Sequence, residues 1–361
     1  MNVLLLTTGA PSRHLKEALK GHTYERHNPS DLYLYVSESM NGYDRIYNGH
    51  RDLSAPSRLK IKDYDAIISR LGSNLGFGAT ILQHLTENLG IYCPQRADGL
   101  LIAQDKMKTI MRLSRYGIRV PMTVFAKNAS HVEHIMGMLG GLPVIAKLLK
   151  GSQGLGVMIC RDAEQTNTTL ESFWGQSIDI MLQRFVDAKR KDVRAIVVGD
   201  KVVVAMQRTG VKDFRANISQ GGSGERIELT DEQEQLCINA ARATGLEFAG
   251  VDLMTDQEGK SYIIEVNGNP GTKIIDVTGH NYFVDLVNHT EARYKQRKQE
   301  QAANGSASAG EPKFGTNGLV SLPPVPSGFA PKSQHEILKE KERAGALTAN
   351  EHAMLTFLDS H

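Results

Sequence analysis

Apolar and polar positions repeat with two different periods along the chain, which divides it into a helix-and-strand part and a strand-rich part. Residues 2–7 form a short apolar run, and the polar stretch after it places Leu15 and Leu19 at helical spacing. DYDAIISRLGS repeats the strand signal, and GATILQHLTENLG predicts a helix that ends at Gly90. We therefore predict an N-terminal α/β domain over residues 1–95.

From Pro143 five β-rich runs follow one another, with one helical stretch between them: PVIAKLLKG, GVMIC, DIMLQRFV, VRAIVVG and KVVVAMQR. The Gly-Asp turn in VVGDKV predicts a hairpin, so the sheet is not all parallel. A helix with a capping box from Thr230 to Gln233 precedes two more strands. This α+β pattern predicts a central subdomain over 96–185 and a C-terminal subdomain over 186–298.

The composition changes again in the C-terminal tail. Residues 299–333 are rich in Gly, Ser, Ala and Pro, which predicts a flexible linker. Residues 334–361 place apolar side chains at the spacing of short amphipathic helices, and such helices need a docking partner. We predict that this tail docks on the rest of its own chain, on a sister subunit or on a protein substrate. The alternative is an inert extension.

Composition and charge narrow the class of protein. The 361 residues are 40% hydrophobic and 23% charged, which is enough for two or three globular domains. A net charge of +2 gives no reason to expect nucleic acid or an anionic membrane as a partner. The three cysteines have neither metal-site nor disulfide spacing, and no apolar run approaches the roughly 18 residues that span a bilayer. We expect a cytoplasmic protein.

Two carboxylates and an amide fall on the last predicted hairpin. With the turn near residue 258, antiparallel pairing places Asp252 opposite Glu265, and Asn267 shares the face of Glu265. A buried ionised carboxylate needs a compensating partner, and oxygen ligands of these types suit magnesium or manganese. The alternative is a solvent-facing strand end without a ligand.

A glycine-rich loop follows an apolar strand that carries Lys147. Its residues Gly151, Gly154 and Gly156 could bring backbone amides over phosphate groups. The loop matches neither the Walker nor the Rossmann pattern, and an ordinary hairpin turn would explain the same glycines.

Several cations accompany these motifs. Lys106 lies on a predicted helix, Arg194 and Arg208 lie on strands, and Arg215 and Asn217 lie in DFRANISQGG. The planar fork of arginine suits phosphate and carboxylate oxygens, which makes these residues candidates for an anionic ligand.

The order of these motifs resembles the ATP-grasp superfamily, specifically RimK-type α-L-glutamate ligases. DFRANISQGG, AGVDLM and IIEVNGNPG together are highly specific, and the resemblance covers about residues 1–295. It implies an ATP-grasp fold preceded by an α/β pre-ATP-grasp domain. It also implies that ATP phosphorylates a carboxylate, and that an amine then attacks the acyl phosphate to give an amide, ADP and phosphate.

The resemblance implies a role for each matching position. The implied ATP-binding residues are Lys106, Lys147, Gly151, Ser152, Gly154, Gly156, Gln183, Arg184, Phe185, Val186 and Asp192. Within this set, the two lysines would hold phosphates, the four residues from Gln183 would line the adenine, and Asp192 would approach the ribose. The implied catalytic residues are Arg208, Arg215 and Asn217. Two magnesium or manganese ions would be held by Asp252, Glu265 and Asn267.

Three departures from the family pattern accompany the match. Arg184 stands where the family usually has Glu, Arg208-Thr209 replaces a double arginine, and TKIIDVTG replaces a Glu-bearing stretch after NPG. The first departure concerns the nucleotide contacts. The other two concern the specificity for the acceptor and the amino acid.

The expected function is therefore that of an ATP-dependent carboxylate–amine ligase that adds glutamate or a similar amino acid to a peptide or protein C-terminus. One alternative is a small-molecule ligase similar to glutathione synthetase. Another is an ATP-binding regulatory module whose catalysis has lapsed, although the intact metal-binding residues and Arg215 argue against it. Expected partners are the amino acid, a peptide or protein acceptor, and further copies of the chain in a dimer or tetramer, with no membrane or nucleic acid.

Overall fold

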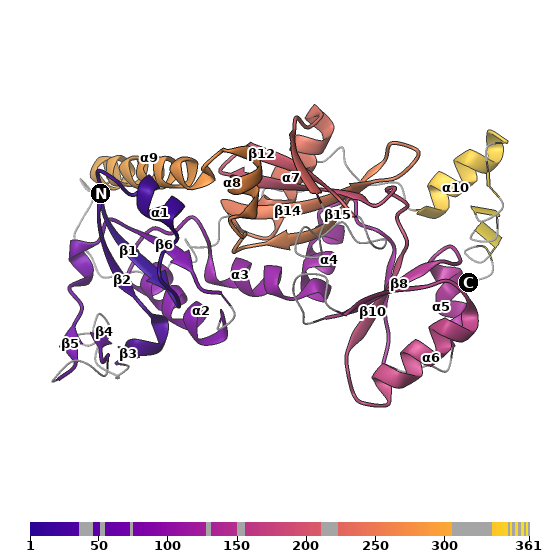
Figure 1. Ribbon diagram of the computed structural model, residues 1–361, viewed down its shortest axis with the longest axis horizontal. Coiled ribbons are helices and arrows are strands. Elements are labelled where there is room, and N and C mark those ends of the chain that lie inside the picture. Colours follow the sequence, from indigo (N-terminus) through magenta and orange to yellow (C-terminus); the bar gives the residue numbers. More distant parts are fainter. Residues whose placement is uncertain are drawn as a thin grey trace.

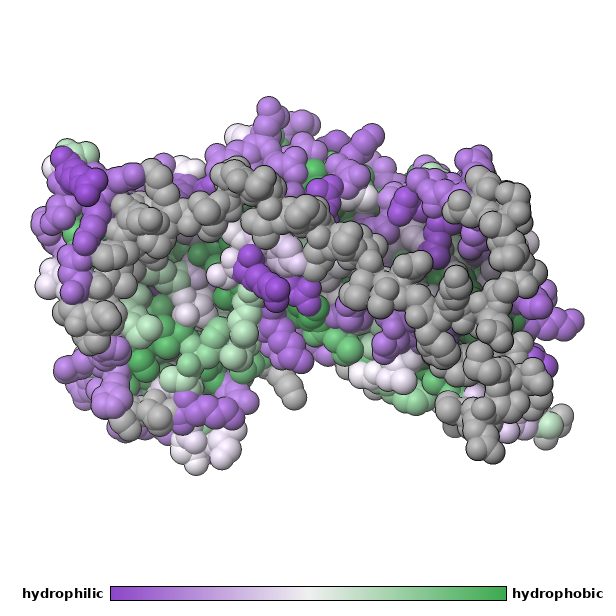
Figure 2. Space-filling view, turned by 180° about the vertical axis from the view of Figure 1, so that it is seen from behind, coloured by the Kyte–Doolittle hydropathy of each residue, from purple (hydrophilic) through white to green (hydrophobic). Residues whose placement is uncertain are grey.

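The computed structural model describes residues 1–35, 46–50, 55–72, 75–127, 131–149, 156–210, 223–304 and 334–345, and parts of 347–359. Figure 1 shows an α/β unit at one end, a larger sheet with helices in the middle, and a smaller lobe of strands and helices at the other end. In the space-filling view, the lower edge of the molecule is hollowed between two lobes (Figure 2). None of the helices in the described ranges is both long and apolar enough to span a bilayer.

The N-terminal unit is built on a parallel sheet, as the α/β prediction requires. The strand order is β2-β1-β6, with bounds Thr23–His27, Asn2–Thr7 and Ala66–Arg70. Helices α1 (Arg13–Ala18) and α2 (Leu75–Gln83) accompany it, and a small antiparallel sheet adds β3 (Leu32–Leu34), β4 (Ile46–Asn48) and β5 (Ser57–Arg58). Thr7 pairs with Arg70, so the carboxyl ends of β1 and β6 lie at the same edge of the sheet.

Helices α3 (Ala97–Gln104) and α4 (Lys106–Arg115) follow this unit. Asp105 separates them because its carboxylate accepts a hydrogen bond from the backbone N of Lys108 at 3.0 Å, which caps α4. Leu100 and Leu113 are buried in one core with residues of both the N-terminal unit and the C-terminal sheet. Helices α3 and α4 therefore do not belong to the core of the central strands, although the sequence placed them with those strands in one subdomain over 96–185.

The central lobe is a four-stranded antiparallel sheet in the order β7-β10-β8-β9. Its strands are Thr123–Phe125, Ile180–Arg184, Val144–Leu148 and Val157–Cys160. Helices α5 (Val132–Met138) and α6 (Ala163–Trp174) share a buried core with alternate residues of these strands, such as Ala146 and Leu182. The opposite face of the sheet therefore carries the intervening residues.

The C-terminal sheet is antiparallel in the order β13-β12-β11-β14-β15. Its strands are Ser223–Ile227, Lys201–Thr209, Lys191–Val198, Phe248–Thr255 and Ser261–Asn267. The VVGDKV hairpin is confirmed as the β11–β12 connection, and the capping box of α7 (Asp231–Ala243) is present. Helix α7 shares a core with one face, whereas α8 (Lys273–Thr278) and α9 (Tyr282–Asn304) share a core with the other.

The predicted linker begins later than the sequence indicated. Helix α9 continues to Asn304, because the Gln, Glu and Ala residues of 299–304 favour helix. The remaining residues, 305–333, lie outside the described part of the chain.

The tail contacts its own chain, which is one of the three partners predicted for it. Helix α10 (Gln334–Arg343) carries Leu338, which is buried together with Leu355 against Met122. Lys341 and Glu351 form an ion pair at 2.5 Å between two parts of the tail. Met122 directly precedes β7, so the tail rests on the edge of the central lobe.

Candidate active site

A row of alternating charges crosses one face of the C-terminal sheet. Arg208 on β12 lies opposite Asp192 on β11, and Arg194 on β11 lies opposite Asp252 on β14. Arg208 Nε and Nη2 contact the two Asp192 oxygens at 2.5 and 2.8 Å, and Arg194 Nε and Nη2 contact those of Asp252 at 2.7 and 2.6 Å. Arg208 Nη2 also donates to Asp252 Oδ2 at 2.9 Å. The two bidentate pairs are thus joined into one network.

Burial and neighbouring charges act in opposite directions on these carboxylates. Burial by itself would raise the pKa of Asp252, but the charges of Arg194 and Arg208 outweigh it and hold that pKa well below its usual range. Burial raises the pKa of Asp192, and the charge of Asp252 adds to this effect although Arg208 opposes it. Asp252 is therefore the more firmly ionised of the two.

The predicted hairpin register is confirmed. Asp252 pairs with Glu265, and Asn267 lies two residues further along β15 opposite Gly250. The register shifts between Asp252 and Leu253, so a bulge lies beside the candidate ligands. Such bulges redirect side chains next to functional sites.

Asp252, Glu265 and Asn267 fit a divalent cation by the chemistry of their oxygens, although arginines already compensate the charge of Asp252. In the described ranges no residue forms an ion pair with Glu265, although its charge acts on the pKa of both Lys147 and Arg194. The two Asp252 oxygens accept three arginine hydrogen bonds out of about four lone-pair sites, so about one site remains. We expected a metal to compensate Asp252, but the structure shows that arginines already do so. Carboxylate and amide oxygens remain the ligand types that magnesium and manganese prefer.

The other charged and sulfur-bearing side chains of the described ranges add no further ligand cluster. No group of three or more His, Cys, Asp or Glu side chains in the described ranges is placed to hold a metal ion. The candidate set contains only two such residues, and its third member is the amide Asn267. Asn267 Oδ1 already accepts a hydrogen bond from the backbone N of Asn269 at 2.9 Å, which orients the amide.

Lys147 lies on β8 between Ala146 and Leu148 and is buried. Its Nζ donates to Gln183 Oε1 at 2.6 Å, and Gln183 Nε2 donates to Thr123 Oγ1 at 2.9 Å. Burial lowers the pKa of Lys147 to about 8, while Glu265 opposes this effect and Lys106 adds to it. The structure therefore places Lys106 and Glu265 within electrostatic reach of Lys147.

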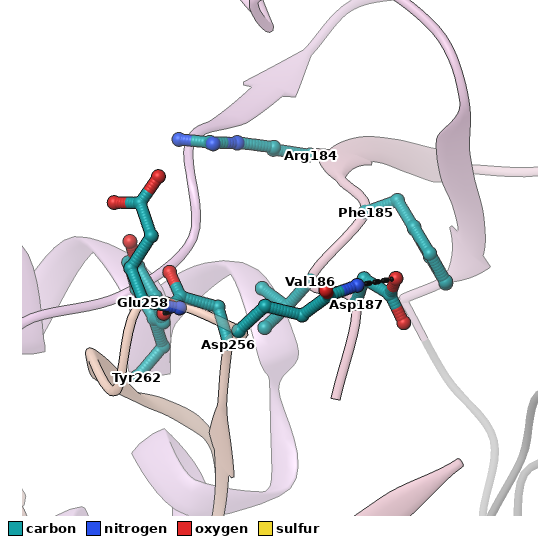
Figure 3. A pocket seen from close by; sticks show the side chains of 8 residues that line it. Arg184, Phe185, Val186, Asp187, Asp256, Glu258 and Tyr262 are labelled. Carbon is teal, nitrogen blue, oxygen red and sulfur yellow. Dashed lines mark hydrogen bonds between the residues drawn. The ribbon is translucent and has the colours of Figure 1, made fainter. Parts of the chain in front are cut away.

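The predicted adenine segment divides between two environments. Gln183 is buried beside Lys147, whereas Arg184, Phe185 and Val186 line a pocket of about 170 Å³. The opposite wall is the β14–β15 turn, residues 256–258, together with Tyr262. In Figure 3 the Arg184 side chain extends over the pocket towards the carboxylate of Glu258. An arginine at this position thus faces acidic side chains of the neighbouring subdomain.

Other predicted residues have different placements. Asp192 is engaged by Arg208, so the structure gives it a partner other than a ribose. Gly156 follows the loop with φ 74°, and a Cβ there would lie 2.4 Å from the Leu148 side chain. Because β8 and β9 pair directly, the hairpin geometry is confirmed, and a phosphate role stays a prediction. The remaining predicted residues lie outside the described ranges: Gly151, Ser152, Gly154, Arg215 and Asn217.

The sequence did not single out the residues that hold the loop after β15. Gln95 is buried, accepts a hydrogen bond from Ser69 Oγ at 2.6 Å and donates to the carbonyl of Gly268. Arg70 Nη2 and the Tyr282 hydroxyl both donate to the Pro270 carbonyl, at 2.8 and 3.1 Å. The only sequence signal was a polar residue at the end of an apolar strand.

Comparison with known proteins decides the family. A RimK-like ATP-grasp domain model matches residues 103–289, which include every predicted site residue. The chain belongs to the RimK-like ATP-grasp family. This RimK-like protein is 35% identical to a probable α-L-glutamate ligase of Marinobacter nauticus over 75% of its own length and 89% of the relative. It is 32% identical to probable α-L-glutamate ligase 2 of Shewanella baltica over 83% of its length and the whole of that relative.

Solved structures confirm the ATP-grasp fold of this RimK-like protein. The ATP-grasp ligase PsnB, in complex with a minimal precursor, Mg and ADP, superposes with a TM-score of 0.62 at 17% identity, over 81% of this chain and 97% of PsnB. A D-alanine–D-alanine ligase from Bacillus anthracis gives a TM-score of 0.56 at 18% identity, over 82% of this chain and 99% of that ligase. The family match and the curated relatives show that the protein is an ATP-dependent ATP-grasp ligase similar to the α-L-glutamate ligases.

Proposed function

We propose that this RimK-like ligase adds glutamate or a similar amino acid to the C-terminus of a peptide or protein. The observation that carries the proposal is the position of Glu265, which lies opposite Asp252 and within electrostatic reach of Lys147. The names of the curated relatives support glutamate as the amino acid. Neighbours solved with precursor peptides support a peptide acceptor.

In this proposal the residues of the chain position ATP and compensate its charge. Lys106 and Lys147 bind phosphate oxygens, and Glu265, Asp252 and Asn267 hold two magnesium or manganese ions. ATP supplies the phosphoryl group that activates the acceptor carboxylate. Such a transfer needs positioning and electrostatic stabilisation more than a covalent nucleophile.

Arg208 has a particular place in this scheme because it already contacts both Asp192 and Asp252. A guanidinium held by two carboxylates is fixed in orientation before any ligand arrives. We infer that Arg208 acts on the phosphoryl group together with Arg215 and Asn217, and that it also fixes Asp252 as a metal ligand.

A small-molecule ligase is the second candidate. One observation favours it: the stretch after NPG, where the family usually carries a glutamate, is helix α8, and its Asp276 contacts Arg13 of the N-terminal unit at 3.2 Å. The departure from the family pattern at this stretch is consistent with a different acceptor.

Release of ADP tests both candidates. The purified full-length protein is incubated with ATP, Mg²⁺ or Mn²⁺ and each amino acid, with and without a set of peptides, and the products are identified by mass spectrometry. Peptide-dependent ADP release with a mass increase of one glutamate per addition would support the proposal. Release with free carboxylic acids alone would favour the small-molecule ligase. If ADP is released with neither peptides nor free carboxylic acids, both candidate functions are wrong. Sedimentation of the same sample tests the expected dimer or tetramer.

A further inference from the structure

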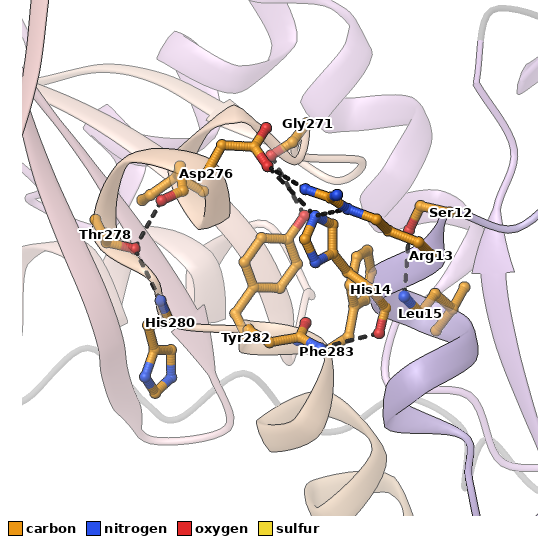
Figure 4. A network of polar contacts seen from close by, with 12 residues as sticks. Ser12, Arg13, His14, Leu15, Gly271, Asp276, Thr278, His280, Tyr282 and Phe283 are labelled. Atoms are coloured by element: carbon orange, nitrogen blue, oxygen red, sulfur yellow. Dashed lines mark hydrogen bonds and ion pairs between the residues drawn. The ribbon is translucent and has the colours of Figure 1, made fainter.

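The N-terminal unit meets the loop after β15 at a seam that the family assignment leaves unexplained. Arg70 ends β6 at the carboxyl edge of the parallel sheet, where ligands of open α/β sheets bind. Its Nη2 atom reaches the carbonyl of Pro270, 200 positions away in the sequence. Figure 4 shows the neighbouring part of the seam, where Arg13 and His14 of α1 contact Asp276 of α8 beside Tyr282.

Arg70 carries a charge that no carboxylate balances in the part of the chain that the structure describes. Its Nη1 atom is buried and has no hydrogen-bond partner there. Its guanidinium carbon lies 5.3 Å from the centroid of the Phe283 ring, and its Nη2 atom is used by Pro270. Burial lowers the pKa of Arg70, but an arginine remains protonated in proteins. A buried cation without a partner of opposite charge is costly, so this position calls for an anion.

An unused acceptor lies in the same loop. Asn269 Oδ1 is buried and finds no donor among the described residues, although the backbone N of Asn269 donates to Asn267 Oδ1. Asn269 is the residue directly before Pro270, which Arg70 contacts. The seam therefore offers one free donor and one free acceptor on neighbouring groups.

The seam is also next to the charged row of the C-terminal sheet. Both Arg70 and Arg194 act on the pKa of Tyr282, so this tyrosine lies within electrostatic reach of both. Arg194 is bound to Asp252, one of the candidate metal ligands. A molecule held at Arg70 would therefore lie beside the site of phosphoryl transfer without being part of it.

We propose that Arg70 and Asn269 bind the amino acid that supplies the amine. Arg70 Nη1 binds the α-carboxylate of this amino acid, and Asn269 Oδ1 accepts a hydrogen bond from the amine and orients it. The neutral amine forms the new C–N bond, the bond between the acyl carbon and the phosphate oxygen breaks, and the phosphate leaves with the amine proton. This inference rests on the proposed function, because it assigns the amine substrate of that reaction.

The test compares L-glutamate with its α-amide, which lacks only the proposed anchor. ADP release in the presence of the acceptor gives kcat/KM for each, in the wild type, Arg70→Gln and Arg70→Lys. Because a charge-assisted hydrogen bond is worth about 1.5–3 kcal/mol, we expect the wild type to prefer the acid at least about tenfold. Arg70→Gln should reduce this preference to within about twofold, and Arg70→Lys should keep part of it. The KM for ATP should stay within about twofold of the wild-type value in both variants.

Two further variants separate substrate binding from a weakened seam. Arg13→Gln removes an exposed ion pair from the same seam, and we expect it to keep the wild-type preference. Asn269→Ala should raise the KM for the amino acid while leaving the ratio between acid and amide unchanged. Circular dichroism and thermal melting show that each variant is folded.

The outcomes that overturn the inference differ from those that overturn the function. If Arg70→Gln keeps the preference for the acid, or if the wild type has none, Arg70 does not bind this carboxylate. If the wild type turns over no amino acid, the proposed function fails, and thermal stabilisation by L-glutamate against its α-amide then decides the inference. A carboxylate-dependent stabilisation that Arg70→Gln abolishes supports the site, and its absence in the wild type overturns it.

Discussion

Arg194 on β11 lies directly opposite Asp252 on β14 and binds both oxygens of its carboxylate, at 2.7 and 2.6 Å. This pair fixes the orientation of Asp252 before any cation arrives. It also means that a cation at this position finds about one lone-pair site of Asp252 that no arginine uses. The arrangement makes separate predictions for stability and for activity.

Replacing Arg194 by methionine should lower the free energy of unfolding by about 3 kcal/mol, because Asp252 loses a buried bidentate partner. Urea denaturation of the ligand-free protein measures this. Arg242→Met is the matched control, because its pair with Asp200 is 46% and 81% exposed and should cost less than about 1 kcal/mol. Equal losses in the two variants would show that the Asp252 pair has no special structural role.

Glu265→Gln should leave stability nearly unchanged, because glutamine has the size and shape of glutamate and the side chain is only half-buried. It should lower turnover by at least about 100-fold, because metal and phosphate positioning weaken together. Steady-state ADP release over a range of Mg²⁺ or Mn²⁺ concentrations measures the effect. Glu225→Gln on β13 serves as the control and should behave as the wild type. Full activity of Glu265→Gln would remove the metal assignment.

The pKa of Lys147 predicts a specific dependence of stability on pH. Folding lowers this pKa from 10.5 to about 8, so the unfolded chain binds more protons than the folded one between these values. The contribution of Lys147 to stability therefore rises as the pH increases from about 8 to about 10.5, by up to about 3 kcal/mol. Comparison of the unfolding free energies of the wild type and Lys147→Met across this range isolates the effect. A constant difference would show that the pKa is not lowered.

The docked tail makes a prediction about local protection. Leu338→Ala should release α10 from Met122 and increase amide exchange across residues 334–345, because a short helix is marginal without its packing face. Hydrogen exchange followed by mass spectrometry measures this. Glu342→Ala on the exposed side of α10 should leave the exchange unchanged. ATP binding and metal dependence should be retained in both variants, and a collapse of ATP binding in Leu338→Ala would show that the tail supports the nucleotide site.

The sequence alone determined the local features of this protein. Periods of two and 3.6 residues located several strands and helices, although not strand β2 or helix α9, and the turn near residue 258 placed Asp252 opposite Glu265. These inferences succeeded because a hairpin register depends on residues that are close in sequence. The motif order also identified the ATP-grasp family, which then supplied a role for each site residue.

Only the tertiary structure decided which side chains meet across distant segments. The order of strands in the sheet brings Arg194 to Asp252, and the packing of the N-terminal unit brings Arg70 to Pro270. A carboxylate on a strand looks the same in sequence whether a metal or an arginine compensates it, because the choice depends on the neighbouring strand. The sequence likewise left the partner of the tail open. An amphipathic helix predicts that its apolar face is covered, but only the packing of the folded chain determines which surface covers it.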